Sequence, residues 1–292
     1  MKKTPCVWEE GLAGEFWKTG RLPFPVYDVH GHMGLHPAIY MSHAAPETMV
    51  RHLRRAGAKL IFTHHYALND WSFRNATCVE IARRFPDDLR VYMAVNPHCQ
   101  KNIEEDLALY DSWAPTVCGL KILADYHRTP VTDARYAKAF AFAEERRLPV
   151  LFHTWGGSSN NGAPQLLELS KRYPHITYLI GHSFYGDWNG VAKVRAESPA
   201  TCYFELTSIP GQAGLIERLV DLVGANRILF GTDLPWFDEF QAIGGVLCAG
   251  ITDDAKKSIL HDNARKVFGE GLPGRELRVK SEELRVTLNN EP

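Results

Sequence analysis

Two histidines separated by a single residue are the first sign of chemistry in this chain. His30 and His32 lie in the segment VYDVHGHM at residues 26–33, one pair among thirteen histidines. The segment alternates apolar and polar residues as a β-strand does, and residues two apart on a strand share a face. Both imidazoles, with Asp28 behind them, are therefore expected on one side of a strand, where they could hold a divalent metal. The alternative is that the two histidines stand two residues apart by chance and have no common function.

Similar residues stand at or near the ends of other predicted strands. They are Lys121 in the fourth, His153 ending the fifth, His182 ending the sixth, Glu205 in the seventh and Asp233 just past the eighth. A buried strand of Val, Ile and Leu has no packing reason to end in such a side chain. Imidazole and carboxylate ligands suit Zn²⁺ best, with Mn²⁺, Fe²⁺ and Ni²⁺ as alternatives.

The order of the predicted elements explains how these residues could meet. Strands are predicted at 26–32, 59–65, 89–95, 117–123, 149–154, 176–182, 200–206 and 226–231. Helical patterns lie between them, among others at 46–57, 75–85, 133–147, 163–173 and 212–223. This alternation predicts a (β/α)8 TIM barrel, with the chemistry at the carboxyl ends of its strands. A doubly wound open sheet is the alternative, and it would leave the candidate residues without a common axis.

The two ends of the chain extend this barrel. A short N-terminal helix is expected because apolar residues recur every four positions, at Trp8, Leu12 and Phe16. Residues 252–268 are predicted to form a last helix, with Thr252 as its N-cap and Gly269 as its stop. The tail beyond Leu272 is expected to cover the barrel or to contact another subunit of a homo-oligomer. We treat residues 1–292 as a single domain.

Composition limits the classes of protein and of partner. The chain is 45% hydrophobic and 11% aromatic, enough for a large core. Its formal charge of -1 gives no electrostatic reason to bind nucleic acid or an anionic membrane. Its six cysteines include no Cys-x-x-Cys pair, and no apolar run approaches the length of a membrane span. We expect a cytoplasmic protein that acts on a small molecule.

Several short motifs together resemble the amidohydrolase superfamily. They are Asp-x-His-x-His at 28–32, Gly-Leu-Lys at 119–121, His153, Gly-His at 181–182 and Gly-Thr-Asp at 231–233. The chain is more narrowly similar to the amidohydrolase-related branch, which includes non-oxidative decarboxylases such as aminocarboxymuconate semialdehyde decarboxylase. The segment ILHDNARKVFG at 259–269 is similar to the terminal helix of that branch. The barrel core that carries the resemblance spans about residues 26–269.

The resemblance implies roles for individual residues. His30, His32, His153 and Asp233 would bind one divalent metal, most simply zinc. His182 would be the catalytic histidine that faces the substrate, and Asp233 would also shuttle a proton. A metal of this kind lowers the pKa of bound water from 15.7 to about 7, which supplies hydroxide at neutral pH.

Three further residues keep alternatives open. Asp28 would orient the histidines of the first strand or bind the metal itself, as a Glu at this position can in some decarboxylases. Lys121 is either a carboxylated lysine that bridges two metals, as in binuclear relatives, or a plain ammonium that binds a substrate carboxylate. Glu205 belongs either to a structural ion pair or to the catalytic machinery. The Gly-rich segment 156–159 lacks the P-loop spacing, and the chain has no Gly-x-Ser-x-Gly elbow.

The predicted reaction is hydrolysis of a small amide, lactone or ester by metal-activated water. The alternative is a non-oxidative decarboxylase with the same site, and a barrel that binds small molecules without turnover is a third hypothesis. Eight aromatic residues on the strand-to-helix loops favour a flat or cyclic substrate: Trp71, Phe73, Trp155, Phe184, Tyr185, Trp188, Trp236 and Phe237. Arg74, Lys121 and Arg128 could pair with its carboxylate. His64 and His65 either line the pocket or are exposed loop residues.

Overall fold

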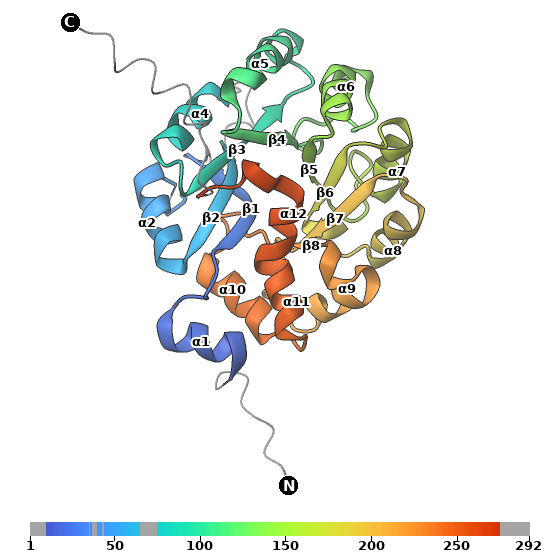
Figure 1. The fold of residues 1–292 in the computed structure, drawn as a ribbon. Helices are drawn as coiled ribbons and strands as arrows, with labels where there is room; N and C mark the ends of the chain where they lie inside the picture. The colour runs from blue at the N-terminus through green and yellow to red at the C-terminus, as the bar shows by residue number, and fades with distance from the viewer. Residues whose placement is uncertain (1–9, 35, 37–39, 43, 65–74, 275–292) are drawn as a thin grey trace, which may run out of the picture.

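Eight parallel strands follow one another around a barrel in the order of the sequence (Figure 1). The computed structural model describes residues 10–34, 36, 40–42, 44–64 and 75–274. The strands are β1 Val26–Met33, β2 Ala58–His64, β3 Leu89–Val95, β4 Val117–Ile122, β5 Pro149–His153, β6 Thr177–Gly181, β7 Thr201–Glu205 and β8 Ile228–Leu229. The Val29 amide donates to the Phe230 carbonyl at 3.0 Å, which joins the last strand region to the first. The predicted TIM barrel is confirmed.

Helices alternate with the strands and surround them. They are α1 Gly11–Thr19, α2 Pro46–Ala56, α4 Asn75–Arg84, α5 Gln100–Trp113, α6 Ala137–Arg146, α7 Ala163–Arg172, α8 Trp188–Glu197, α9 Leu215–Val223, α10 Glu239–Cys248, α11 Asp253–Lys257 and α12 Asn263–Phe268. In the part of the chain that the structure describes, no helix is long and apolar enough to cross a membrane.

Most predicted element boundaries differ from the observed ones by one or two residues, and the larger differences have local causes. β8 is only two residues long because residues 225–227 form a 3-10 turn before it. α9 begins at Leu215 rather than at residue 212 because Gly214 adopts a left-handed conformation, with φ 82°. The predicted helix at 133–147 begins as a 3-10 turn, and Asp133 accepts a hydrogen bond from the Arg135 amide.

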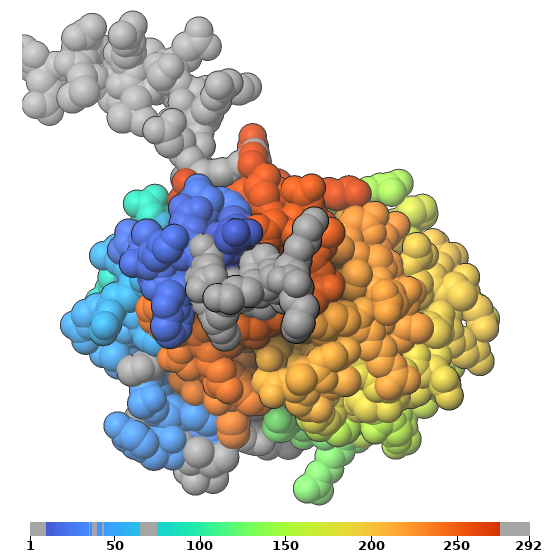
Figure 2. All heavy atoms as spheres, turned by 90° about the horizontal axis from the view of Figure 1, so that it is seen from below, coloured from blue at the N-terminus to red at the C-terminus, as the bar shows by residue number. Residues whose placement is uncertain are grey.

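The short N-terminal helix packs against the C-terminal part of the chain. Phe16 of α1 lies 6.1 Å from Phe240 of α10, measured between ring centroids. The Leu12 amide donates to Asp253 at 3.0 Å, and Figure 2 shows α1 side by side with these orange C-terminal helices. Trp8, the first residue of the predicted apolar stripe, lies outside the described residues.

The last helical segment closes the amino end of the barrel. Thr252 caps it as predicted, since its hydroxyl accepts from the Ala255 amide at 3.2 Å. A π-helical turn at Ser258–Asp262 joins α11 to α12, and Gly269 ends the segment with φ 53°. Side chains of this segment, Ala264, Phe268 and Leu272, pack with inward-facing residues of the barrel: Tyr27, Val29, Ile61, Tyr92, Leu151, Leu179, Tyr203 and Leu229. The chemistry is therefore confined to the carboxyl end.

A bulge in β1 decides which side chains enter the barrel. Asp28 pairs with Leu60 and Gly31 with Phe62, so β1 advances three residues while β2 advances two. The extra residue lets Val29 and His30 both turn inward, as bulges beside active sites commonly do. Asp28 stays on the outer side with Leu60. The expectation that Asp28 shares a face with His30 and His32 is therefore wrong, because strict alternation does not hold across the bulge.

The tight contact between β4 and β5 predicts a stability effect. A Cβ atom on Gly119 would lie 2.4 Å from the backbone oxygen of Pro149, where little can move. We expect Gly119→Ala to lower the free energy of unfolding by about 1–3 kcal/mol in urea titrations. Gly244→Ala in α10 is the control, because a methyl group added there would meet nothing within 4 Å and alanine favours a helix. Equal stability of the two variants would contradict this packing.

Candidate metal centre

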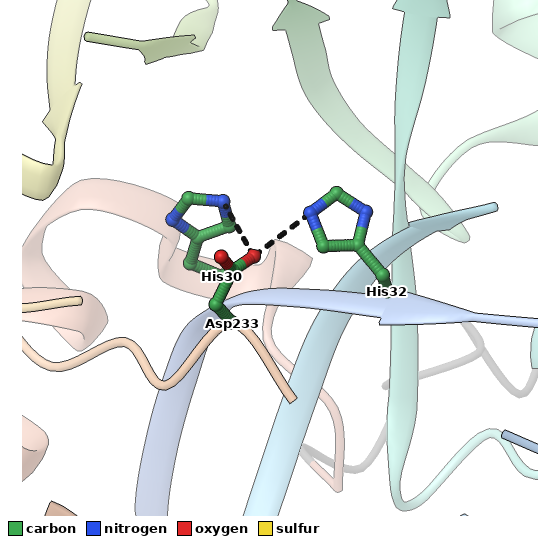
Figure 3. Close-up of side chains that lie close together, drawn as sticks. All are labelled: His30, His32 and Asp233. Atoms are coloured by element: carbon green, nitrogen blue, oxygen red, sulfur yellow. Dashed lines mark ion pairs between the residues drawn. The ribbon is translucent and has the colours of Figure 1, made fainter. Parts of the chain in front are cut away.

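Three side chains converge at the carboxyl end of the barrel (Figure 3). His30, His32 and Asp233 each offer one ligand atom, and these atoms lie within 4.8 Å of one another. Oδ1 of Asp233 lies 2.9 Å from Nε2 of His32 and 3.4 Å from Nε2 of His30. Both histidines are buried, with 1% and 3% of their side chains exposed. This is the only such group of potential ligands found among the described residues.

Both imidazoles are oriented by partners on their outer nitrogens. Nδ1 of His30 lies 2.9 Å from the Glu205 carboxylate, and Nδ1 of His32 lies 3.1 Å from the Thr63 hydroxyl. A carboxylate beside Nδ1 favours the tautomer with its proton there, which leaves the Nε2 lone pair free to bind a metal. Burial lowers the pKa of both imidazoles, so they are neutral, as metal ligands must be.

Asp233 is held in an unusual backbone conformation. Its φ is 63°, in the left-handed region that non-glycine residues rarely adopt. Its amide donates to the His30 carbonyl at 2.7 Å, and the His32 amide donates to the Leu234 carbonyl at 2.6 Å. Strain of this kind persists only where surrounding contacts enforce it, and it is common at functional sites. Burial alone would raise the pKa of Asp233, but His30 and His32 hold it well below its usual range.

Glu205 contacts residues of the candidate centre, with His30 as one side-chain partner. Its Oε1 accepts from the Thr207 amide at 2.6 Å, and its Oε2 accepts from the His182 amide at 3.1 Å. Burial raises the pKa of Glu205 to about 7, although these hydrogen bonds favour the charged form. Of the alternatives raised by the sequence, the geometry supports a group that pairs with and orients His30.

Lys121 reaches the centre from β4. Its side chain is fully buried, and its Nζ lies 2.6 Å from Nε2 of His30, the nitrogen that would face a metal. Burial lowers the pKa of Lys121 to about 8. Lys121 and a metal bound here would therefore compete for one nitrogen. Both the bridging role and the carboxylate-binding role stay predictions.

The two other histidines predicted for the site, His153 and His182, lie beside the three-residue group. The ring of His182 lies 5.2 Å from that of His30 and 4.6 Å from that of His153, measured between centroids. Nδ1 of His182 lies 3.2 Å from the Ser208 hydroxyl, and burial lowers the pKa of His182 to about 3. His153 is not part of the three-residue group above. Its role as a fourth ligand stays a prediction.

The donor set fits a divalent cation. Among the described residues, two buried atoms beside the centre have no hydrogen-bond partner: Nε2 of His182 and Oδ1 of Asp233. Oδ1 of Asp233 lies close to Nε2 of both imidazoles, so three donor atoms face one point. A cation bound among His30, His32 and Asp233 would be held by one carboxylate and two imidazoles, the ligands that suit zinc.

Aromatic rings lie beside His153 and His182. Trp155 stacks on His153 at 6.3 Å with an interplanar angle of 8°, and it lies 4.8 Å from Tyr185. Tyr126 lies 5.2 Å from His153, and its pKa is raised by burial and by the charge of Asp233. Tyr126 was not among the predicted aromatic residues, because it stands in a polar loop without a repeating pattern.

The other predicted pocket residues differ in how deeply they are buried. Phe184 is fully buried in the core, and Trp188 packs against that core. Trp236 and Phe237 are partly exposed beyond β8, Arg128 is exposed, and His64 is buried at the end of β2. His65, Trp71, Phe73 and Arg74 lie outside the described residues.

The structure thus combines a (β/α)8 barrel with an inward His-x-His pair and an Asp after the last strand. The sequence model of the amidohydrolase family matches residues 27–269. The chain therefore belongs to the amidohydrolase family, as its motifs predicted. A comparison with curated proteins finds no significant match to its sequence.

Solved structures with a similar fold include three decarboxylases. The 2,6-dihydroxybenzoate decarboxylase from Rhizobium is 15% identical, with a TM-score of 0.65 over 84% of this chain and 98% of that one. The 5-carboxyvanillate decarboxylase from Sphingomonas paucimobilis is 11% identical, with a TM-score of 0.63 over 84% and 99%. A dihydroxybenzoic acid decarboxylase from Polaromonas, solved with bound manganese, is 15% identical, with a TM-score of 0.65 over 84% and 97%. At these identities the likeness shows the fold alone.

The buried, incompletely paired centre predicts that metal stabilises the protein. We expect a strong chelator to lower the melting temperature and added Mn²⁺ or Zn²⁺ to restore it, since a ligand at about 1,000 times its Kd contributes about 4 kcal/mol. His30→Ala should bind little metal by elemental analysis and show no chelator effect. His175→Ala, which alters an exposed histidine paired with Glu144, is the control. Full metal content in His30→Ala would refute this centre.

Proposed function

We propose that this amidohydrolase-family protein is a metal-dependent, non-oxidative decarboxylase of a small carboxylated ring compound. The observation that carries the proposal is Lys121, a buried cation placed against a cluster of metal-type ligands. A metal and an ammonium side by side would bind a carboxylate strongly in a site shielded from water. The three decarboxylases of similar fold support the same substrate chemistry.

The metal would be held by His30, His32 and Asp233, with His153 as the proposed fourth ligand. Zinc is the simplest expectation from imidazole and carboxylate ligands, whereas manganese is the metal named in one of the similar structures. When bound, the metal supplies a positive charge that orients the substrate and stabilises developing negative charge. Metal content and reactivation with each ion separately decide between the two metals.

The remaining steps belong to residues of this chain. Trp155 and Tyr126 provide flat surfaces for the ring, and Lys121 moves from His30 to the incoming carboxylate. As the carbon–carboxylate bond breaks, its electron pair stays on the carbon and CO₂ leaves. A proton from water then binds that carbon, and the hydroxide left behind is released to the solvent or combines with the CO₂ as bicarbonate. Nε2 of His182, which has no hydrogen-bond partner among the described residues, relays that proton. Burial normally keeps this imidazole neutral, and the negative charge of the substrate makes its protonation easier.

Hydrolysis of a lactone, amide or ester is the second candidate, and it was the main prediction from the sequence. The observation in its favour is the carboxylate of Asp233 beside His30 and His32, which could accept a proton from an attacking water. The same centre can serve both reactions, but the comparisons support decarboxylation better.

A substrate panel separates the two reactions. We expect the metal-loaded protein to release CO₂ from hydroxylated benzoates, and to turn over their uncharged amide and lactone counterparts far more slowly. CO₂ release and ring opening are measured in parallel on the same preparation. Turnover confined to uncharged lactones or amides would favour the hydrolase, and no turnover by a metal-loaded protein would favour a binding protein.

His182 is expected to be catalytic rather than a metal ligand. His182→Asn keeps approximate size and hydrogen bonding but cannot exchange a proton near neutral pH. We expect it to retain fold and metal while turnover falls by at least about 100-fold, as for a lost general acid or base. Loss of metal would make His182 a ligand instead, and nearly normal turnover would leave it a structural residue.

A further inference from the structure

The turn that carries His182 after β6 has a rare backbone conformation. His182, Ser183 and Phe184 have φ angles of 60°, 48° and 52°, so three successive residues lie in the left-handed region. Residues with a Cβ atom enter that region at a cost, and they normally do so singly. None of the three is glycine, which would make the turn easy to form. Contacts from other segments must therefore hold it in place.

This conformation decides where the imidazole of His182 points. Gly181 brings the chain close to the candidate centre, since a Cβ atom there would lie 3.3 Å from Cε1 of His30. The left-handed turn follows directly, and it leaves the rings of His182 and His30 5.2 Å apart, measured between centroids. The direction of a side chain follows its backbone, so a right-handed turn at this place would aim His182 elsewhere.

Thr154, directly after β5, contacts both ends of this turn. Its hydroxyl donates to the Gly181 carbonyl at 2.6 Å and accepts from the Phe184 amide at 3.0 Å. Its own amide donates to the same Gly181 carbonyl at 3.2 Å. The side chain is fully buried, so solvent does not compete for these bonds. One hydroxyl group thus spans the turn, from the residue before His182 to the second residue after it.

Other contacts fix single points of the same turn. The Ser183 hydroxyl donates to the Glu205 carbonyl at 2.8 Å, and the His182 amide donates to the Glu205 carboxylate at 3.1 Å. The Ser208 hydroxyl lies 3.2 Å from Nδ1 of His182, where it can set the rotation of the ring. The direction in which the ring leaves the backbone depends on the turn as a whole, which Thr154 ties together.

We propose that Thr154 is a positioning residue: its hydroxyl ties Gly181 to Phe184 and holds the left-handed turn that aims His182 at the candidate centre. This inference rests on the proposed function, in which His182 relays a proton to the substrate. Thr154 itself touches neither substrate nor metal. Its effect on the reaction therefore passes through the position of His182.

A double-mutant cycle tests this dependence on His182. Thr154→Val keeps the shape of the side chain and removes the hydroxyl, and we expect turnover of the metal-loaded protein to fall at least about 10-fold, as for a displaced catalytic group. Thr154→Ser keeps the hydroxyl and should retain most of the turnover. When His182→Asn is already present, Thr154→Val should lower turnover less than about twofold, because the group that it positions is gone. Equal losses in the two backgrounds would overturn the inference.

Crystal structures give a second measurement that does not depend on the reaction. In Thr154→Val we expect residues 182–184 to leave the left-handed region and the ring of His182 to move away from His30. An unchanged turn in this variant would overturn the inference. A displaced turn in Thr154→Ser would do the same, even if Thr154→Val does not fold. A wild-type protein that releases no CO₂ would overturn the proposed function, and the structures would still decide the role of Thr154.

A buried hydroxyl elsewhere in the barrel serves as the control. Ser170 of α7 is buried, and its hydroxyl donates to the Leu167 carbonyl at 2.9 Å. Ser170→Ala removes this hydrogen bond without touching the turn after β6. We expect wild-type turnover and an unchanged position of His182. A loss of turnover as large as that of Thr154→Val would show that any lost buried hydroxyl has this effect, and would overturn the specific role of Thr154.

Discussion

The closing of the barrel and the assembly of the candidate metal centre depend on the same backbone contacts. His30 and His32 come from the first strand and Asp233 from the loop after the last, more than 200 residues later. The same two backbone hydrogen bonds, from Asp233 to His30 and from His32 to Leu234, join the sheet ends and set the ligands side by side. The rest of the fold serves to bring these two segments together, and the bulge in β1 turns His30 to the inside at that junction.

The candidate centre also brings several ionisable groups together away from water. Lys121, Glu205 and Asp233 are ionisable groups placed in a region that excludes water, where an unpaired charge is costly. Without a cation, Lys121 supplies the positive charge beside His30. A cation at Nε2 of this histidine would compete with the lysine, which under the proposed function would then be free to pair with an anionic ligand.

Much of this arrangement could be predicted, and the exceptions share a cause. The strand-ending residues His30, His153 and His182 were found because periodicity places strand ends, and a barrel gathers them. Asp28 was assigned to the wrong face, since a bulge leaves no mark in an alternating pattern. Tyr126 could not be found, because a polar loop carries no periodic relation to the centre. The reaction was harder still, because hydrolysis and decarboxylation use the same residues.

The last helices have a consequence for how the protein is made. Nδ1 of His261 lies 2.7 Å from the Pro25 carbonyl, and Tyr27 stacks on the same imidazole at 5.1 Å, so the start of β1 is covered by a residue that is translated 236 positions later. During synthesis on a ribosome, β1 has neither its β8 neighbour nor this cover until these later segments have emerged. An open strand edge is prone to wrong pairing in that interval. The nascent chain is therefore open to wrong pairing at its first strand, which carries two of the candidate metal ligands.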